Sequence, residues 1–149
     1  MLSIFHTIIS LPFGIVLTNP VLIFISAGVF HLFADSLLHW NIYPQEMKRF
    51  PVVFIALDVV GGLAVAVALL GSTAFTLPVL VAIAGGNFPD VLHTSWNLLP
   101  RTAQHRAPRW LRSAFAFHDG LQRETYDIAR GLVWQIVLAV IALLILTLS

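Results

Sequence analysis

The sequence predicts an all-α protein, a polytopic transmembrane bundle of about five helices with one amphipathic helix at the membrane interface. Three observations lead to this prediction. Of the 149 residues, 58% are hydrophobic and 10% are charged, whereas soluble domains have about 25% charged residues. The apolar residues form runs close to the ~20 residues that a helix needs to cross a bilayer. The remaining polar residues are concentrated in a few connecting segments.

Each apolar run is expected to form one span of a single domain that covers residues 1–149. The first run is short and contains Pro12 and Gly14, so its helix is expected to be kinked or tilted. Thr18-Asn19-Pro20 is a turn signal that separates the first two runs. The predicted spans are about 2–17, 21–40, 52–70, 77–99 and 131–148.

Two parts of the second half depart from a plain apolar helix. The fourth run contains Gly85-Gly86-Asn87-Phe88-Pro89, which predicts a broken or kinked helix. The segment of about 100–130 is the one long polar stretch. From Pro108 onward its apolar residues recur on one helical side, opposite Arg109 and Arg112. This pattern predicts a helix that lies in the cytoplasmic interface.

The basic residues give the orientation. All of them lie in two segments that five spans would put on one side of the membrane, and the positive-inside rule makes that side cytoplasmic. The N-terminus is then cytoplasmic and the C-terminus lies outside. The basic residues are Lys48, Arg49, Arg101, Arg106, Arg109, Arg112, Arg123 and Arg130.

Three aspartates, Asp35, Asp58 and Asp90, lie inside predicted spans with no basic residue beside them. An ionised carboxylate in a bilayer costs about 2.5–3.5 kcal/mol even on the lenient insertion scale. The predicted topology puts all three at one depth, near the cytoplasmic face. A shared divalent cation would offset their mutual repulsion. Because cysteine is absent, such a metal site must use nitrogen and oxygen ligands.

Histidines at helical spacing strengthen this prediction. The motif His31-x3-Asp35-x3-His39 places three possible ligands on one helix stripe, with neighbours about 5–6 Å apart. The whole motif spans about 12 Å, so Asp35 and one histidine would bind an ion directly, or two ions would be bridged. The alternative is a polar stripe that hydrogen-bonds across helices or lines a water pocket.

Further site residues come from other segments. Asp90 and His93 share a helix face and are expected to be ligands, the alternative being a proline kink with a polar residue that satisfies freed backbone groups. Asp58 is expected to be a ligand or the general base; otherwise it is a proton-carrying acid or an interhelical hydrogen-bonding group. His118 is either a catalytic residue that caps the site or an ordinary interfacial histidine. His6, near the cytoplasmic start of the first span, is expected to be an ordinary interfacial histidine, the alternative being a residue of the site.

The basic segment also indicates partners. Arginines near Trp110 would attract anionic lipid headgroups, or hold a lipid phosphate beside the metal. The segment is short and close to the membrane, and the chain has no phosphate-binding glycine loop, so membrane lipids are expected as partners and nucleic acid is not. His105 is expected to be solvated.

The motifs resemble those of bacterial inner-membrane metal-dependent hydrolases under LexA control, a family distantly grouped with zinc-dependent phospholipase C. His31-Leu-Phe-Ala-Asp35 matches the family's His-x3-Asp helix motif. Phe88-Pro89-Asp90-Val91-Leu92-His93 is similar to its Leu-Pro-Asp-x-Asp-His motif, with Leu92 in place of the second acid. His118-Asp119-Gly120 is weakly similar to its His-Arg-Gly segment, and the order of the motifs differs. The chain is also similar to small bacterial membrane proteins with His-x3-Asp-x2-Pro-His-Trp-Asp, which here ends Leu38-His39-Trp40-Asn41.

The residues and the resemblance together imply a multi-pass protein of the bacterial inner membrane that uses a divalent metal, zinc first of all, to hydrolyse a phosphoester or acyl ester. The expected substrate is a phospholipid or a lipid-linked phosphate. The alternative is a non-catalytic metal-binding, ion- or proton-conducting or accessory membrane protein, and a third possibility is haem held by two histidines. The expected metal ligands are His31, Asp35, His39, Asp58, Asp90 and His93, and the expected catalytic residues are Asp58 and His118.

Overall fold

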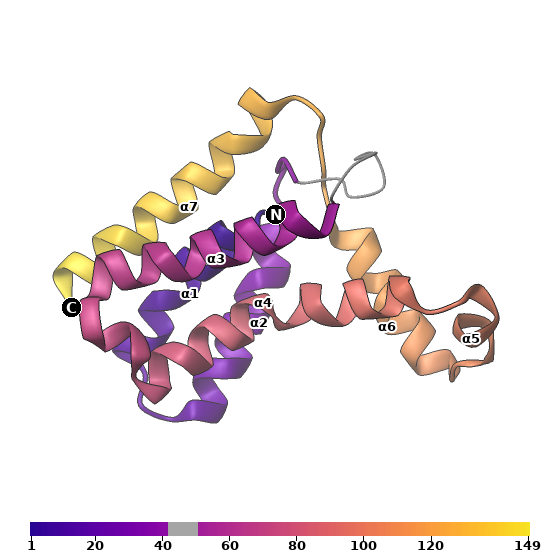
Figure 1. Ribbon diagram of the computed structural model, residues 1–149, viewed down its shortest axis with the longest axis horizontal. Helices are drawn as coiled ribbons and strands as arrows, with labels where there is room; N and C mark the ends of the chain where they lie inside the picture. The colour runs from indigo at the N-terminus through magenta and orange to yellow at the C-terminus, as the bar shows by residue number, and fades with distance from the viewer. Residues whose placement is uncertain (42–50) are drawn as a thin grey trace.

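Figure 1 shows the computed structural model of the protein, which describes residues 1–41 and 51–149. Within these residues the fold is all-helical, which confirms the all-α part of the prediction, and the only β-type pairing is an isolated bridge between His39 and Glu124. The helices are α1 (Ser3–Val16), α2 (Pro20–Asp35), α3 (Pro51–Leu70), the 3₁₀-helix η1 (Gly71–Phe75), α4 (Leu77–Leu98), α5 (Arg101–Arg106), α6 (Arg109–Leu121) and α7 (Ile128–Leu148).

Local sequence signals set the start of two helices. The Asn19 side chain accepts hydrogen bonds from the backbone N–H groups of Val21 (2.9 Å) and Leu22 (3.2 Å), and Pro20 occupies the first turn of α2. Such caps satisfy donors that have no partner inside the helix. Asp127 caps α7 in the same way, with a bond of 3.1 Å. The turn predicted before the second apolar run is therefore present as a helix cap.

Helix α2 ends at Asp35, so the predicted span of 21–40 is too long and His39 does not lie on this helix. The chain after Asp35 pairs instead with the segment that follows α6. The His39 N–H donates to the Arg123 carbonyl, and the His39 carbonyl accepts from the Thr125 N–H, both at 2.9 Å. These tertiary partners satisfy the backbone outside a helix. The prediction that His31, Asp35 and His39 lie on one helical stripe is therefore wrong for His39.

The fourth apolar run forms one continuous helix, α4, which is not broken at Gly85–Pro89. The glycine pair instead permits close packing. A Cβ at Gly85 would lie 2.6 Å from the Phe24 carbonyl oxygen in α2, and a Cβ at Gly86 would lie 2.5 Å from Ser10 Oγ in α1. The two glycines therefore let α4 approach both neighbours one turn before Asp90.

Helix α1 is the centre of the bundle, although it is short. It packs against α2, α3, α4 and α7, and its buried face carries both apolar and polar residues. Helices α5 and α6 project from one side of this bundle, away from the C-terminus of α7 (Figure 1). Helix α6 returns to contact α2 and α4. Polar residues of α1, α2, α4 and α6 thereby come close to one another.

Many large apolar side chains are exposed, while several polar side chains are buried beside the apolar core. Helices α3 and α7 expose rows of large apolar side chains, such as Leu57, Val60, Ile136 and Leu144. Two helical segments, Val53–Phe75 and Ile128–Leu148, are long and apolar enough to cross a membrane. Helices α1 and α2 are apolar but shorter than 18 residues. Among the residues whose burial is described, the buried polar ones are His6, Thr7, Ser10, His31, Asp35, His39, His118 and Gln135.

Candidate metal centre

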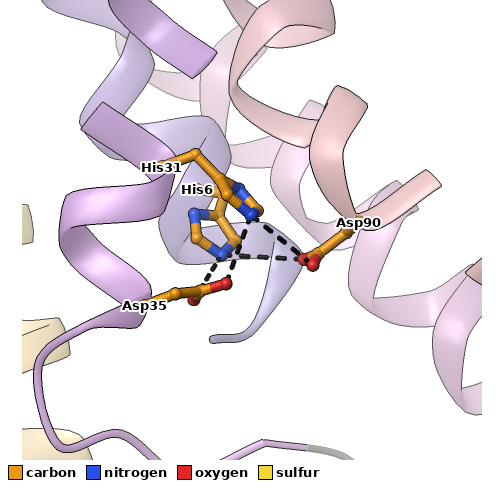
Figure 2. A group of neighbouring side chains, drawn as sticks. All are labelled: His6, His31, Asp35 and Asp90. Atoms are coloured by element: carbon orange, nitrogen blue, oxygen red, sulfur yellow. Dashed lines mark ion pairs between the residues drawn. The ribbon is translucent and has the colours of Figure 1, made fainter. Parts of the chain in front are cut away.

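Four side chains from three helices converge inside the bundle: His6 of α1, His31 and Asp35 of α2, and Asp90 of α4 (Figure 2). Each offers one ligand atom, and these atoms all lie within 4.8 Å of one another. The Nε2 atom of His6 lies 3.2 Å from an Asp35 oxygen and 3.7 Å from an Asp90 oxygen. The corresponding distances from His31 Nε2 are 3.2 and 3.5 Å. We call this group the four-ligand cluster.

The helices position each member of the four-ligand cluster. His31 and Asp35 lie one turn apart on α2, so their side chains share a face. The glycine pair of α4 brings Asp90 towards the same face, and α1 supplies His6 from the centre of the bundle. His6, His31 and Asp35 are fully buried, whereas the Asp90 side chain is 30% exposed. Asp90 therefore lies on the open side of the cluster.

The cluster fits a divalent ion. Two ligands of a tetrahedral zinc ion lie about 3.3 Å apart, since each bond is about 2.0–2.1 Å long. The four observed separations of 3.2–3.7 Å are close to this value. Both ring nitrogens of His6 and the Oδ2 atom of Asp35 are buried without a hydrogen-bond partner among the described residues. Buried polar atoms normally have partners, so these unpaired atoms are donors that a divalent ion could use.

The ring orientation of His31 is fixed by a second contact. Its Nδ1 atom lies 2.7 Å from the Gly86 carbonyl oxygen, which can only accept a hydrogen bond. Nδ1 therefore carries a proton, and Nε2 faces Asp35 and Asp90, where a neutral imidazole would present its lone pair to a metal ion. This arrangement, in which the remote nitrogen of a ligating histidine donates to a carbonyl, is usual around protein-bound metals.

His39 borders the cluster but is not one of its four members. Its Nδ1 atom donates to the Leu37 carbonyl at 2.8 Å, which leaves Nε2 free of protons. Nε2 lies 3.8 Å from Asp35 Oδ1 and 4.0 Å from Glu124. The Met1 amine donates to the same Asp35 oxygen at 2.8 Å. His39 thus faces Asp35 from the segment after α2, where that segment pairs with the residues that follow α6.

A second group of possible ligands lies against the first. His93 of α4 and His118 and Asp119 of α6 also present ligand atoms within 4.8 Å of one another. The Nε2 atom of His118 is 3.5 Å from that of His31 and 3.9 Å from Asp35 Oδ2, so the two groups touch. Burial, together with the nearby His93, lowers the pKa of His118 to about 4. Its imidazole is therefore neutral at neutral pH, as a metal ligand must be.

Asp58 belongs to neither group, and its contacts match the alternative in which it is an interhelical hydrogen-bonding group rather than a ligand or general base. Its two carboxylate oxygens accept backbone N–H bonds from Ser3 (2.6 Å) and Ile4 (3.1 Å) at the start of α1. No residue of α1 itself caps this terminus with a side chain. A carboxylate at a helix N-terminus is favourable, because it pairs orphan donors and the positive end of the helix dipole. Asp58 is a helix cap supplied by α3.

Sequence reasoning therefore found three of the four cluster members, His31, Asp35 and Asp90, and missed His6. No acid lies near His6 in the sequence, so its partners appear only when α1 packs against α2 and α4. Its predicted depth, near the cytoplasmic start of the first span, was the one available signal. Asp119 was also missed, because the sequence shows it only as the residue after His118.

Comparison of the chain with models of protein families, with curated proteins and with solved structures finds no match.

Proposed function

We propose that this protein is a membrane-embedded, metal-dependent hydrolase whose site lies near the cytoplasmic face and acts on a phospholipid or a lipid-linked phosphate. The observation that carries the proposal is the convergence of two imidazoles and two carboxylates in a buried position, with orphaned atoms among them. Burying such groups without a partner is costly. A bound cation would pair these groups and so offset the cost of burying them.

The membrane setting is supported by where apolar and polar residues lie. Most helices turn large apolar side chains outward, while histidine, aspartate and glutamine are buried inside. An outer surface of this kind is suited to lipid rather than water. We infer five spans with the N-terminus in the cytoplasm of a bacterial cell, so that the arginines of residues 101–130 remain on the cytoplasmic side. In this topology the four-ligand cluster opens towards the cytoplasmic leaflet.

The donor set favours zinc. Imidazole nitrogen and carboxylate oxygen are both good zinc ligands, and the buried position of three of the four donors suits a tightly held ion. A bound divalent ion would supply Lewis-acid chemistry, by polarising a phosphoryl or acyl oxygen and activating water. The chain itself orients the donors: the Gly86 carbonyl fixes the His31 ring. His6, His31 and Asp35 are fully buried, so the inner side of the cluster is closed to solvent.

Features of α6 and of the surface formed by α1, α3 and α4 support a lipid substrate. Helix α6 exposes Trp110 and Phe117, while Arg109 and Arg112 flank a shallow hollow of about 310 Å³ beside Ser113. Aromatic side chains with neighbouring arginines suit a membrane surface with anionic headgroups. A second hollow of about 390 Å³ lies among α1, α3 and α4, where it could accept an acyl chain. Its lining is mostly apolar and consists of Ser3, Thr7, Val59, Leu63, Ile83, Ala84, Asn87, Phe88 and Val91.

Metal analysis of the full chain, purified in detergent, tests the proposal first. We expect a stoichiometric divalent ion that Asp35→Asn and His31→Gln remove. The exposed Asp127, which caps α7, offers a matched control: Asp127→Asn should keep the metal. Vesicles of phosphatidylglycerol and phosphatidylcholine, and lipid phosphomonoesters, are then assayed for released headgroup or phosphate. Wild-type protein without stoichiometric metal would contradict the proposal, whereas metal with proton flux and no hydrolysis would favour the conducting alternative.

A further inference from the structure

The group formed by His93, His118 and Asp119 lies outside the four-ligand cluster and has no role in the proposed function. His93 Nε2 lies 2.6 Å from Asp119 Oδ1, and the His93 and His118 rings have centroids 4.9 Å apart. We propose that these three side chains bind a second divalent ion, next to the first, and that this ion attaches α6 to the bundle. The inference rests on the proposed function, because it adds an ion to the same centre.

The surroundings of His118 point to a ligand at this second group. His118 is 6% exposed, and its Nδ1 atom is buried without a hydrogen-bond partner among the described residues. An imidazole that is buried for packing alone would normally have its N–H paired. His93 is largely buried as well, while Asp119 is exposed enough for an ion to enter from the aqueous side. Two imidazoles and one carboxylate are a common set of three protein ligands for zinc.

The donors are too many for one ion. Together the two groups offer seven donors, more than the four that one tetrahedral zinc ion takes, so the three further donors suit a second ion. Asp35 lies at the junction, since its Oδ2 atom is 3.2 Å from His31 Nε2 and 3.9 Å from His118 Nε2. Ligand sets that share such a boundary are typical of two-metal centres, whose ions lie about 3.5–4 Å apart. Such centres are found in phosphatases and nucleases, so the inference favours a phosphoester substrate over a carboxylic ester.

The second group also joins two parts of the molecule. His93 lies in the bundle on α4, whereas both other donors lie on α6, which projects from it (Figure 1). The other contacts here include the stacking of Trp96 on Phe115, with ring centroids 4.5 Å apart. An ion between α4 and α6 would therefore hold the amphipathic helix, with its arginines, beside the first site.

Zinc titration of the metal-stripped full chain in detergent, with bound metal counted by elemental analysis, tests the inference. We expect two zinc ions per chain in the wild type, and one in each of His93→Gln and Asp119→Asn. Asp119 is more than half exposed, so its variant is expected to fold. His105→Gln is the matched control, because His105 is exposed on α5, in neither ligand group, and this variant should bind two ions.

Protection from trypsin gives a second readout. Zinc should slow cleavage after Arg112 in the wild type and in His105→Gln, and this protection should be lost in both second-site variants. One zinc ion in the wild type, with no change in either variant, would overturn the inference and reduce His93 and Asp119 to a hydrogen-bonded pair. That result leaves the proposed function intact if Asp35→Asn then binds none. A wild type that binds no zinc overturns both proposals.

Discussion

The imidazole ring of His6 in α1 stacks on that of His31 in α2, with ring centroids 3.8 Å apart and planes inclined by 24°. Each ring directs Nε2 towards both Asp35 and Asp90 (Figure 2). The stack brings two donors from different helices to the same pair of carboxylates. His6 is therefore the member of the cluster that links the central helix α1 to the donors on α2 and α4.

Replacing His6 with glutamine should weaken zinc binding by more than about 100-fold. Loss of a group that only hydrogen-bonds to a metal ligand lowers metal affinity about 10–100-fold, and loss of a ligand itself should cost more. Competition with a chromogenic zinc chelator measures the affinity. His105→Gln, which changes an exposed histidine, should bind zinc as the wild type does. Unchanged affinity in His6→Gln would show that His6 is a packing residue and not a ligand.

Much of the fold could be predicted because hydropathy and helix signals act locally. The bounds of α1, α3, α4 and α7 follow the predicted apolar runs closely, and the amphipathic pattern after Pro108 corresponds to α6. The end of α2 could not be predicted, because the residues after Asp35 pair with a strand-like segment near Arg123, far along the chain. The glycine pair of α4 can be recognised in the sequence. Whether such a pair breaks the helix or lets it pack closely against another depends on neighbouring helices that the sequence does not identify.

The site was predictable only where its donors lie on one helix turn. His31 and Asp35 are four residues apart, so helical geometry alone brings them together. Asp58 and Asp90 looked equivalent as buried acids, yet one caps α1 and the other joins the cluster. That difference comes from the packing of α1 between α3 and α4. Metal binding by the residues of the four-ligand cluster remains a prediction.

Asp58→Ala should destabilise the protein without removing the metal. It deprives the backbone N–H groups of Ser3 and Ile4 of their acceptors, and the loss of a helix cap typically costs about 0.5–2 kcal/mol. Thermal unfolding in detergent, followed by circular dichroism, should show a lower midpoint. Asp58→Asn, which keeps one acceptor oxygen, should recover part of the loss. If Asp58→Ala lost its stoichiometric zinc but kept the wild-type unfolding midpoint, Asp58 would be a metal ligand after all.

Gly86→Ala should weaken both packing and metal binding. The added Cβ would lie 2.5 Å from Ser10 Oγ and 3.1 Å from the His6 carbonyl oxygen, so α1 and α4 must move apart. Overpacking of this kind costs about 1–3 kcal/mol. The Gly86 carbonyl also orients His31, so zinc affinity should fall together with the unfolding midpoint. Gly120→Ala is the control, since nothing lies within 4 Å of its Cβ, and it should change neither measurement.

Removal of metal should lower the stability of the wild type reversibly. The apo cluster leaves two carboxylates close together and buried nitrogens without partners, whereas an ion that binds only the folded state adds about 2.7 kcal/mol at 100 times its dissociation constant. A chelator should therefore lower the thermal unfolding midpoint, and added zinc should restore it in a concentration-dependent way. A double variant, His31→Gln with Asp35→Asn, should respond to neither addition. An equal response in that variant would place the stabilising ion somewhere other than the four-ligand cluster.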